Sequence, residues 1–169
     1  MIVMGSRGMG GLSGMVMGSV SASVVSHASC PVVVVREDNH VTDSTKYGPV
    51  VVGVDGSEVS QKATAYAFRE AQARGAALIA VHTWMDMQVQ ASLAGLSAAQ
   101  SEWAEIEREQ SELLAENLKE PREEYPEVEV KQLITRDRPV NALTEAAVGA
   151  QLLVVGSHGR GGFKGMLLG

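Results

Sequence analysis

The chain has 169 residues, 45% of them hydrophobic, and a formal net charge of −6. This length and composition suit a domain with a buried core, and the negative charge disfavours nonspecific binding to nucleic acid or to an anionic membrane surface. No apolar run is long enough to span a membrane and no signal peptide is recognisable, so we expect a cytoplasmic protein with neither nucleic-acid nor membrane partners.

The first part of the chain predicts a strand, a glycine loop, a helix and a second strand. Residues 1–4 are a short apolar strand end, and residues 19–28 are small-residue helix material opened by a Gly-Ser pair. The unbroken run PVVVV at 31–35 is typical of a strand buried on both faces in a parallel sheet. Cys30, the single cysteine, excludes an internal disulfide and a cysteine-based zinc site, and we expect it to pack as a small hydrophobic residue. The polar segment 37–48 reads as a linker.

Strands and helices alternate after the linker. Further strands are predicted at 50–54, 77–82, 128–134 and 152–155, and helices between Ser57 and Gly75, at 97–119 and at 141–148. The helix at 97–119 has a predicted apolar face made of Trp103, Ile106, Leu113, Leu114 and Leu118. This alternation predicts an α/β fold with an open parallel sheet and helices on both of its faces.

The chain repeats itself near its two ends. Residues 3–18 read VMGSRGMGGLSGMVMG and residues 154–169 read VVGSHGRGGFKGMLLG, with matching glycines 151 residues apart. A repeat of that size is one whole domain. We therefore expect residues 1–36 to be the C-terminal part of a first domain, with its fourth strand, glycine loop, helix and fifth strand, and residues 49–169 to be a second domain that ends within its glycine loop.

The glycine loop is suited to phosphate binding. Its pattern is Gly5-x-x-Gly8, nine residues, then Gly18-Ser19, and it joins the carboxyl end of a strand to the start of a helix. Open α/β sheets bind ligands at this place, and free N–H groups at a helix N-terminus suit an anion. The pattern is neither a Walker loop nor a dinucleotide fingerprint, since Lys164 lies outside the Walker position. From the loop alone, a glycine-rich turn without a ligand remains an alternative.

The loop, the sequence VVGVDGS at 51–57 and the sequence AVHTW at 80–84 together resemble the universal stress protein family, in particular its ATP-binding branch. The resemblance extends over nearly the whole chain outside the linker. It is complete in the first loop, whereas the second loop matches at Gly156, Gly159 and Gly169 only. It implies a Rossmann-like fold similar to the adenine nucleotide alpha hydrolases, with five strands in the order 3-2-1-4-5. It also implies a stress-response or signalling module that binds ATP, with or without Mg²⁺.

The resemblance further implies where the nucleotide contacts lie. The aspartate after the first strand of the domain, Asp55, would lie near the ribose and adenine, and the residue after the strand histidine, Thr83, would offer its backbone to adenine. The remaining implied contacts border the ribose and phosphates in either copy of the repeat. They are Met4, Gly5, Gly8, Gly18, Ser19, Val20 and Ser21 in the first copy, and Val155, Gly156, Gly159 and Gly169 in the second.

Several of these residues also have simpler interpretations. For Asp55 the simpler alternative is that it only caps the following helix, and we favour the nucleotide role. His82 reads as a buried strand histidine and not as a base, because no serine or cysteine nucleophile signature accompanies it. Arg7 and His158 share one loop position, where each either approaches phosphate or faces solvent. The glutamates of 97–119 predict a solvated helix face, and no metal site is supported.

Three functions compete at this stage. The first is a nucleotide-binding stress or signalling module that is not an enzyme. The second is a very slow ATP hydrolase, which would lack an evident general base, a Walker lysine and an arginine finger. The third is a structural or dimerisation module without nucleotide, against which the intact first loop argues.

The segment 31–35 bears on partners and on topology. As an exposed apolar edge strand it would pair with another strand, and family dimers pair their last strands, so we expect a homodimer or pseudo-dimer through Pro31–Val35. Within the chain, we expect residues 19–35 to dock beside the strand at 152–155 and complete its sheet. Residues 1–4 would then lose their place, because a free chain end costs more entropy to order.

Overall fold

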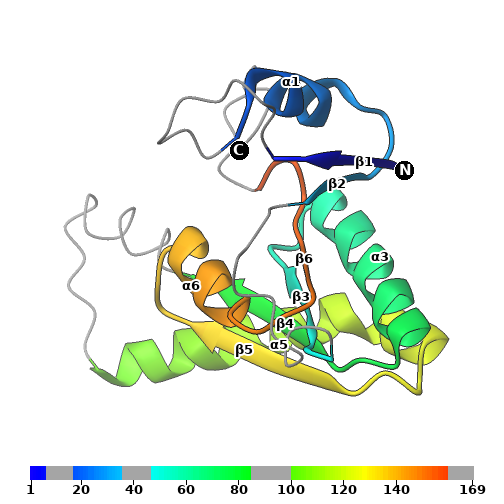
Figure 1. Ribbon diagram of the computed structural model, residues 1–169. Helices are drawn as coiled ribbons and strands as arrows, with labels where there is room; N and C mark the ends of the chain where they lie inside the picture. The colour runs from blue at the N-terminus through cyan, green and yellow to red at the C-terminus, as the bar shows by residue number, and fades with distance from the viewer. Residues whose placement is uncertain (7–16, 36–46, 85–99, 160–169) are drawn as a thin grey trace. The chain divides into compact units, whose positions relative to one another are not determined.

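The computed structural model describes residues 1–6, 17–35, 47–84 and 100–159, and the side chains of these residues except those of 100–103. The chain divides into two compact units. The smaller unit is Met1–Val41 with Gly161–Gly169, and the larger unit is Thr42–Arg160. Figure 1 shows the helices and strands of both units.

The larger unit holds a four-stranded parallel sheet in the order β5-β4-β3-β6. Its strands are β3 (Val50–Gly53), β4 (Leu78–Thr83), β5 (Val130–Thr135) and β6 (Leu152–Val154). In the centre of the sheet Val51 pairs with Ile79 on one side and with Leu153 on the other. The α/β class is confirmed, and the order matches the first four positions of the predicted 3-2-1-4-5. The predicted fifth strand is not part of this sheet.

Helices cover both faces of this sheet, as predicted (Figure 1). They are α3 (Glu58–Arg74), α5 (Gln100–Glu124) and α6 (Pro139–Ala146). One buried cluster joins alternate residues of β3 to α3 and α5, with Phe68 and Leu118 fully buried. A second cluster on the opposite face joins Val51 and Val81 to Ala142 of α6. The strictly β-branched run at 50–52 is therefore buried on both faces, which is why it shows no alternation.

The two long helices differ in how well their sequence predicted them. Helix α3 begins after Ser57, whose side chain accepts a hydrogen bond from the Ser60 N–H at 3.2 Å, and it ends at Gly75 with φ +60°. In α5, Leu114 and Leu118 are buried with Gln110 one turn before them, while Leu113 is 44% exposed. The prediction that Leu113 belongs to the apolar face is wrong, because helical spacing leaves it beside the stripe and not on it.

The smaller unit holds β1 (Ile2–Gly5), α1 (Ser19–His27) and β2 (Val32–Val35). The two strands form a parallel pair in the register Ile2 to Val32 through Gly5 to Val35. Two expectations are corrected here. Among the described residues β2 pairs with β1 and not with β6, and residues 1–4 contribute to a paired strand. The physical reason is that β1 and β2 are joined by the short crossover through α1, which costs less loop-closure entropy than reaching a strand near the other end of the chain.

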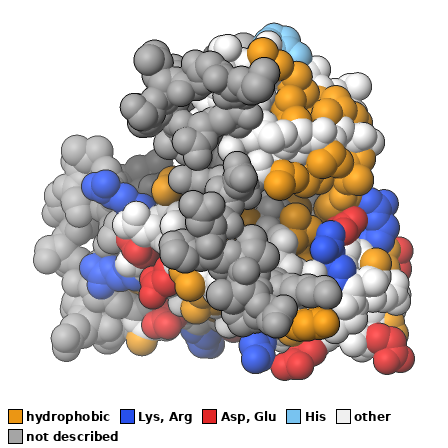
Figure 2. Space-filling model, viewed as in Figure 1, with side chains coloured by type: hydrophobic (Ala, Val, Ile, Leu, Met, Phe, Trp, Pro, Cys, Tyr) orange, Lys and Arg blue, Asp and Glu red, His pale blue; other side chains and the backbone are white. Residues whose placement is uncertain are grey.

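Two valines of β2 and the single cysteine are more exposed to solvent than the sequence predicts. Val34 is 37% exposed and Val35 is 53% exposed, so the prediction of a strand buried on both faces is wrong for β2, which has β1 and α1 as its packing partners. Cys30 is exposed as well, contrary to expectation. In Figure 2, hydrophobic side chains (orange) gather mainly in the upper right of the view. Across the described ranges, no helix is long and apolar enough to cross a membrane.

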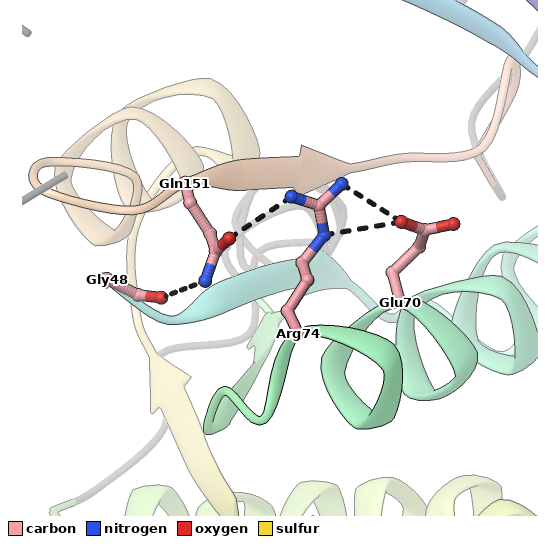
Figure 3. A network of polar contacts seen from close by, with 4 residues as sticks. All are labelled: Gly48, Glu70, Arg74 and Gln151. Atoms are coloured by element: carbon pink, nitrogen blue, oxygen red, sulfur yellow. Dashed lines mark hydrogen bonds and ion pairs between the residues drawn. The ribbon is translucent and has the colours of Figure 1, made fainter. Parts of the chain in front are cut away.

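A polar network ties the amino ends of β3 and β6 to the last turn of α3 (Figure 3). The guanidinium of Arg74 donates to Glu70 at 3.0 and 3.3 Å and to the side-chain oxygen of Gln151 at 3.1 Å. The amide nitrogen of Gln151 donates to the carbonyl oxygen of Gly48 at 2.7 Å. This network lies at the amino end of the sheet, and the opposite, carboxyl edge carries the predicted site residues of the larger unit.

Candidate functional site

The carboxyl edge of the larger sheet brings predicted site residues from three strands together. Asp55 follows β3, Thr83 ends β4, and Val155 and Gly156 follow β6. Because β3 lies between β4 and β6, Asp55 sits in the middle of this edge. Open α/β sheets hold their ligands outside the carboxyl ends of the strands. The larger unit therefore gathers one group of the predicted contacts.

Asp55 shapes the turn between β3 and α3. Its Oδ1 accepts a hydrogen bond from the Ser57 N–H at 2.9 Å, and its own N–H donates to the Ser60 hydroxyl at 3.0 Å. The side chain that caps α3 is that of Ser57. Asp55 thus supports the start of the helix. The hydrogen bond from Ser57 is accepted by Oδ1, whereas Oδ2 lies toward Gly159.

Two glycines of the second loop copy permit close backbone approaches at this edge. A Cβ added at Gly159 would lie 2.9 Å from Asp55 Oδ2, and one added at Gly156 would lie 3.0 Å from Val59 Cγ1. Both distances are too short for an undisturbed side chain. The first turn of the loop is therefore packed directly against the aspartate and the beginning of α3. His158 lies in the same turn, with its Nδ1 3.0 Å from the Ser157 hydroxyl.

The neighbouring strand ends carry residues that sequence reasoning missed. Thr83 pairs with Thr135 across β4 and β5, and the residue that follows β4, Trp84, is buried. The Arg136 guanidinium lies over the Trp84 ring, 5.7 Å from its centroid. The sequence did offer a signal for this contact, because Trp84 directly follows β4 and Arg136 directly follows its neighbour β5.

His82 is buried, as predicted, and both of its ring nitrogens have partners. Nδ1 lies 2.7 Å from the carbonyl oxygen of Val54, and Nε2 lies 2.9 Å from Oε1 of Gln110 on α5. The residue is 7% exposed and Gln110 is 4% exposed. Its partner could not be named from the sequence, since the rotation of α5 about its axis decides which side chain faces β4.

The smaller unit carries the second group of predicted contacts. Gly18 is the N-cap of α1, and its N–H donates to the Ser6 carbonyl oxygen at 2.8 Å. Ser19 and Val20 are exposed in the first turn of the helix, where backbone N–H groups have no partner within the helix. Ser21 is buried, and its hydroxyl donates to the carbonyl oxygen of Gly5 at 2.9 Å.

The rest of the predicted set is quickly placed. Met4 is half-buried on β1. Gly8 and Gly169, and with them Arg7, lie outside the described residues. In the part of the chain that the structure describes, no three His, Cys, Asp or Glu side chains lie together so as to hold a metal ion.

The sequence itself decides the family. The profile described as the universal stress protein family matches residues 1–36 and 46–169. The chain therefore belongs to the universal stress protein family. It is 47% identical over 169 residues to the universal stress protein Rv2005c of Mycobacterium tuberculosis and 45% identical to a universal stress protein of Mycolicibacterium smegmatis. Each comparison covers all of this chain and 55% of the relative. The chain therefore spans about half the length of these relatives.

Solved universal stress proteins share the fold. The UspA protein of Lactobacillus plantarum matches with a TM-score of 0.57 at 20% identity, covering 73% of this chain and 86% of that one. A universal stress protein of Archaeoglobus fulgidus matches with a TM-score of 0.56 at 24% identity, covering 95% of this chain and 52% of that one. A universal stress protein solved in complex with cAMP matches with a TM-score of 0.50 at 25% identity, covering 65% of this chain and 76% of that one.

Proposed function

We propose that this universal stress protein binds an adenine nucleotide, with ATP as the ligand, with or without Mg²⁺, and acts as a stress-response or signalling module. The observation that carries the proposal is the packing of the second loop's Gly159 against Asp55 at the carboxyl edge of the sheet. A similar universal stress protein in complex with cAMP supports an adenine ligand for this fold. The chain spans about half the length of its relatives. The role as a stress-response or signalling module is therefore proposed both for this chain and for any longer protein that contains it.

The proposed roles follow from the chemistry of each residue. Asp55 can accept hydrogen bonds from ribose hydroxyls, and the backbone at Thr83 can supply the donor and acceptor that an adenine edge requires. Gly156 and Gly159 keep the loop backbone free of side chains beside Asp55. In the smaller unit, taken by itself, the first turn of α1 has Ser19 and Val20 exposed, and its backbone N–H groups suit an anion such as a phosphate.

A titration with ATP tests this proposal through a matched pair of aspartates. We expect Asp55→Ala to weaken ATP binding about tenfold, or about 1.4 kcal/mol, because the ribose loses its acceptor. Asp137→Ala is the control, since Asp137 also accepts a backbone hydrogen bond, from Arg138 at 2.6 Å, but lies after β5. Calorimetry at one salt concentration measures both variants. Equal affinities for ATP in the wild type and in Asp55→Ala would rule out the proposed site.

We propose binding without rapid turnover, so that the module is not an enzyme. The described residues at this edge offer hydrogen-bond donors and acceptors, while the histidine of β4, His82, has both ring nitrogens engaged inside the protein. A steady-state phosphate-release assay should stay well below the ~1–10³ per second typical of enzymes. A rate within that range that is lost in Ser19→Ala would favour the hydrolase instead.

We also propose that β2 is the contact between two copies of the chain. The strand is continuous, apolar and partly exposed, and the described residues pair it with β1 alone. An apolar strand with an open edge is a template for another strand. A cytoplasmic location stays a prediction from the sequence.

A further inference from the structure

Two stripes of side chains that face each other in the larger unit are apolar for most of their length and end in a polar pair. On β4 the stripe is Leu78, Ala80 and His82, and on α5 it is Leu118, Leu114 and Gln110. Leucine at 110 would continue the apolar packing, yet the chain buries an imidazole and an amide there. A buried polar pair costs free energy unless its hydrogen bonds are satisfied, so its place at the carboxyl edge of the sheet asks for an explanation.

The imidazole joins three elements at this edge. It belongs to β4, its Nε2 lies 2.9 Å from Gln110 of α5, and its Nδ1 lies 2.7 Å from the carbonyl oxygen of Val54. The register of β3 with β4 ends at Gly53 paired with Val81, so Val54 lies just beyond the ladder. Val54 immediately precedes Asp55, and His82 immediately precedes Thr83. The His82 ring thus connects the two chain segments that carry the proposed adenosine contacts.

The position of the protons follows from the partners. A carbonyl oxygen only accepts, so Nδ1 carries a hydrogen and donates it to Val54. Nε2 then accepts from the Gln110 amide nitrogen in the neutral ring, or donates to the Gln110 oxygen in the charged ring. Rotation of the amide by half a turn supplies either partner. Glutamine at 110 therefore satisfies Nε2 of His82 in both arrangements, which leucine cannot do.

We propose that His82 is a positioning residue for the nucleotide site: with Gln110 behind it, it holds the end of β3 against β4 and so fixes the separation of Asp55 and Thr83. The inference rests on the proposed function, because it assigns a task to a residue that itself touches no nucleotide. It explains why a polar pair replaces apolar packing at this end of the two stripes.

We call the link that His82 makes between Val54 and Gln110 the clamp. Amide hydrogen exchange tests the clamp without any nucleotide. The Val54 N–H donates to the Val81 carbonyl oxygen at 2.8 Å, so it reports on the end of β3. In His82→Leu we expect its exchange to accelerate about tenfold relative to the mid-strand Val52 amide, because local opening adds to global unfolding. His82→Asn, whose amide nitrogen is bonded to Cγ as Nδ1 is and can still donate to Val54, should restore the ratio. Leu118→Ala, a truncation in the same stripe far from the site, should leave the ratio unchanged even though the whole unit is less stable.

Titration of the same proteins with ATP tests the consequence for binding. We expect about tenfold weaker affinity in His82→Leu, near wild-type affinity in His82→Asn, and unchanged affinity of the folded fraction in Leu118→Ala. The ¹⁵N spectrum of the wild type should show a protonated Nδ1 for His82 at neutral pH. Gln110→Leu keeps the stripe packed, removes the partner of Nε2 and should shift the Val54 ratio in the same direction.

The outcomes separate this inference from the proposed function. If ATP binds to the wild type and equally well to His82→Leu, His82 does not position the site. An unprotonated Nδ1, or a Val54 ratio that is the same in His82→Leu and Leu118→Ala, would overturn the clamp itself. If the wild type binds no adenine nucleotide while the Val54 ratio rises as expected, the proposed function and the nucleotide role fail, and the link between β3 and α5 stands alone.

Discussion

At the residue scale, one glycine at the amino end of the larger sheet, Gly48, lies against the backbone of residues 149 and 150. A Cβ added at Gly48 would collide with the carbonyl oxygen of Gly149 and lie 3.2 Å from the Cα of Ala150. Gly75 has the opposite problem, since its φ is +60° but nothing lies within 4 Å of the place a Cβ would occupy. The two positions therefore separate steric collision from conformational preference.

We expect Gly48→Ala to lower the free energy of unfolding by about 3 kcal/mol, because backbone has to move to make room for the methyl group. Gly75→Ala should cost about 1 kcal/mol, the price of a left-handed alanine at a helix end. Urea denaturation followed by circular dichroism measures both. Equal losses in the two variants would mean that the segment around Gly149 yields easily.

How far single residues could be predicted depends on whether the information is local. Asp55 and Thr83 could be placed at the edge of the sheet, since Asp55 comes just after one mainly apolar strand and Thr83 ends the next. The contact of Gln110 with His82 could not, because it depends on the packing of α5 over β4. Whether Asp55 caps or binds was left open by the sequence, and the structure shows one oxygen engaged in the turn and the other toward Gly159.

At the element scale, α3 carries two ion pairs of equal spacing and unequal surroundings. Lys62 and Glu58 are 73% and 81% exposed at the start of the helix. Arg74 and Glu70 are 40% and 21% exposed at its end, and Arg74 also donates to Gln151 before β6 (Figure 3). The second pair joins the helix to the sheet, whereas the first lies along the helix surface.

Replacing the two cations by alanine should separate these contributions. We expect Arg74→Ala to cost about 1 kcal/mol of unfolding free energy, since its hydrogen bonds to a charged and a neutral partner are both lost. Lys62→Ala should stay within about 0.5 kcal/mol, as exposed pairs usually do. Thermal unfolding of both variants at low and high salt measures these changes in stability. A larger loss for Lys62→Ala than for Arg74→Ala would contradict the assigned roles.

The apolar runs show where prediction of elements fails. The sequences at 50–52 and 32–35 are both β-branched without interruption, and both form parallel strands. The first is fully buried between two partners, while the second remains partly exposed beside β1. A run of valines indicates a strand that suits burial. Which strands and helices then surround it is decided by the whole chain.

At the scale of the whole molecule, the repeat gives the chain two copies of the same strand and loop beginning. Both copies form parallel strands, β1 in the smaller unit and β6 in the larger. The expectation that one copy would displace the other failed because each has a partner of its own. Within the described ranges β2 pairs with β1 alone, and its other edge is the one that we propose for assembly.

Light scattering at increasing concentration tests assembly through β2. We expect the wild type to form a dimer and Val34→Lys to remain a monomer, because a charge on an edge strand opposes pairing. Val148→Lys is the matched control, since Val148 is 81% exposed in the larger unit and lies outside any strand. A dimer that persists in Val34→Lys would place the contact elsewhere.

The central place of β3 also sets the order in which the protein can be made. Val50 pairs with Leu78 soon after it leaves the ribosome, but its other neighbour, Leu152, is synthesised about 100 residues later, ~5–20 s at ordinary translation speeds. During this interval a strand whose valines 50–52 are fully buried in the folded protein has one edge unpaired, and contacts so distant in sequence also slow folding. The growing chain is thus most prone to aggregate shortly before β6 emerges, and this is the stage at which a chaperone that binds extended apolar segments would act.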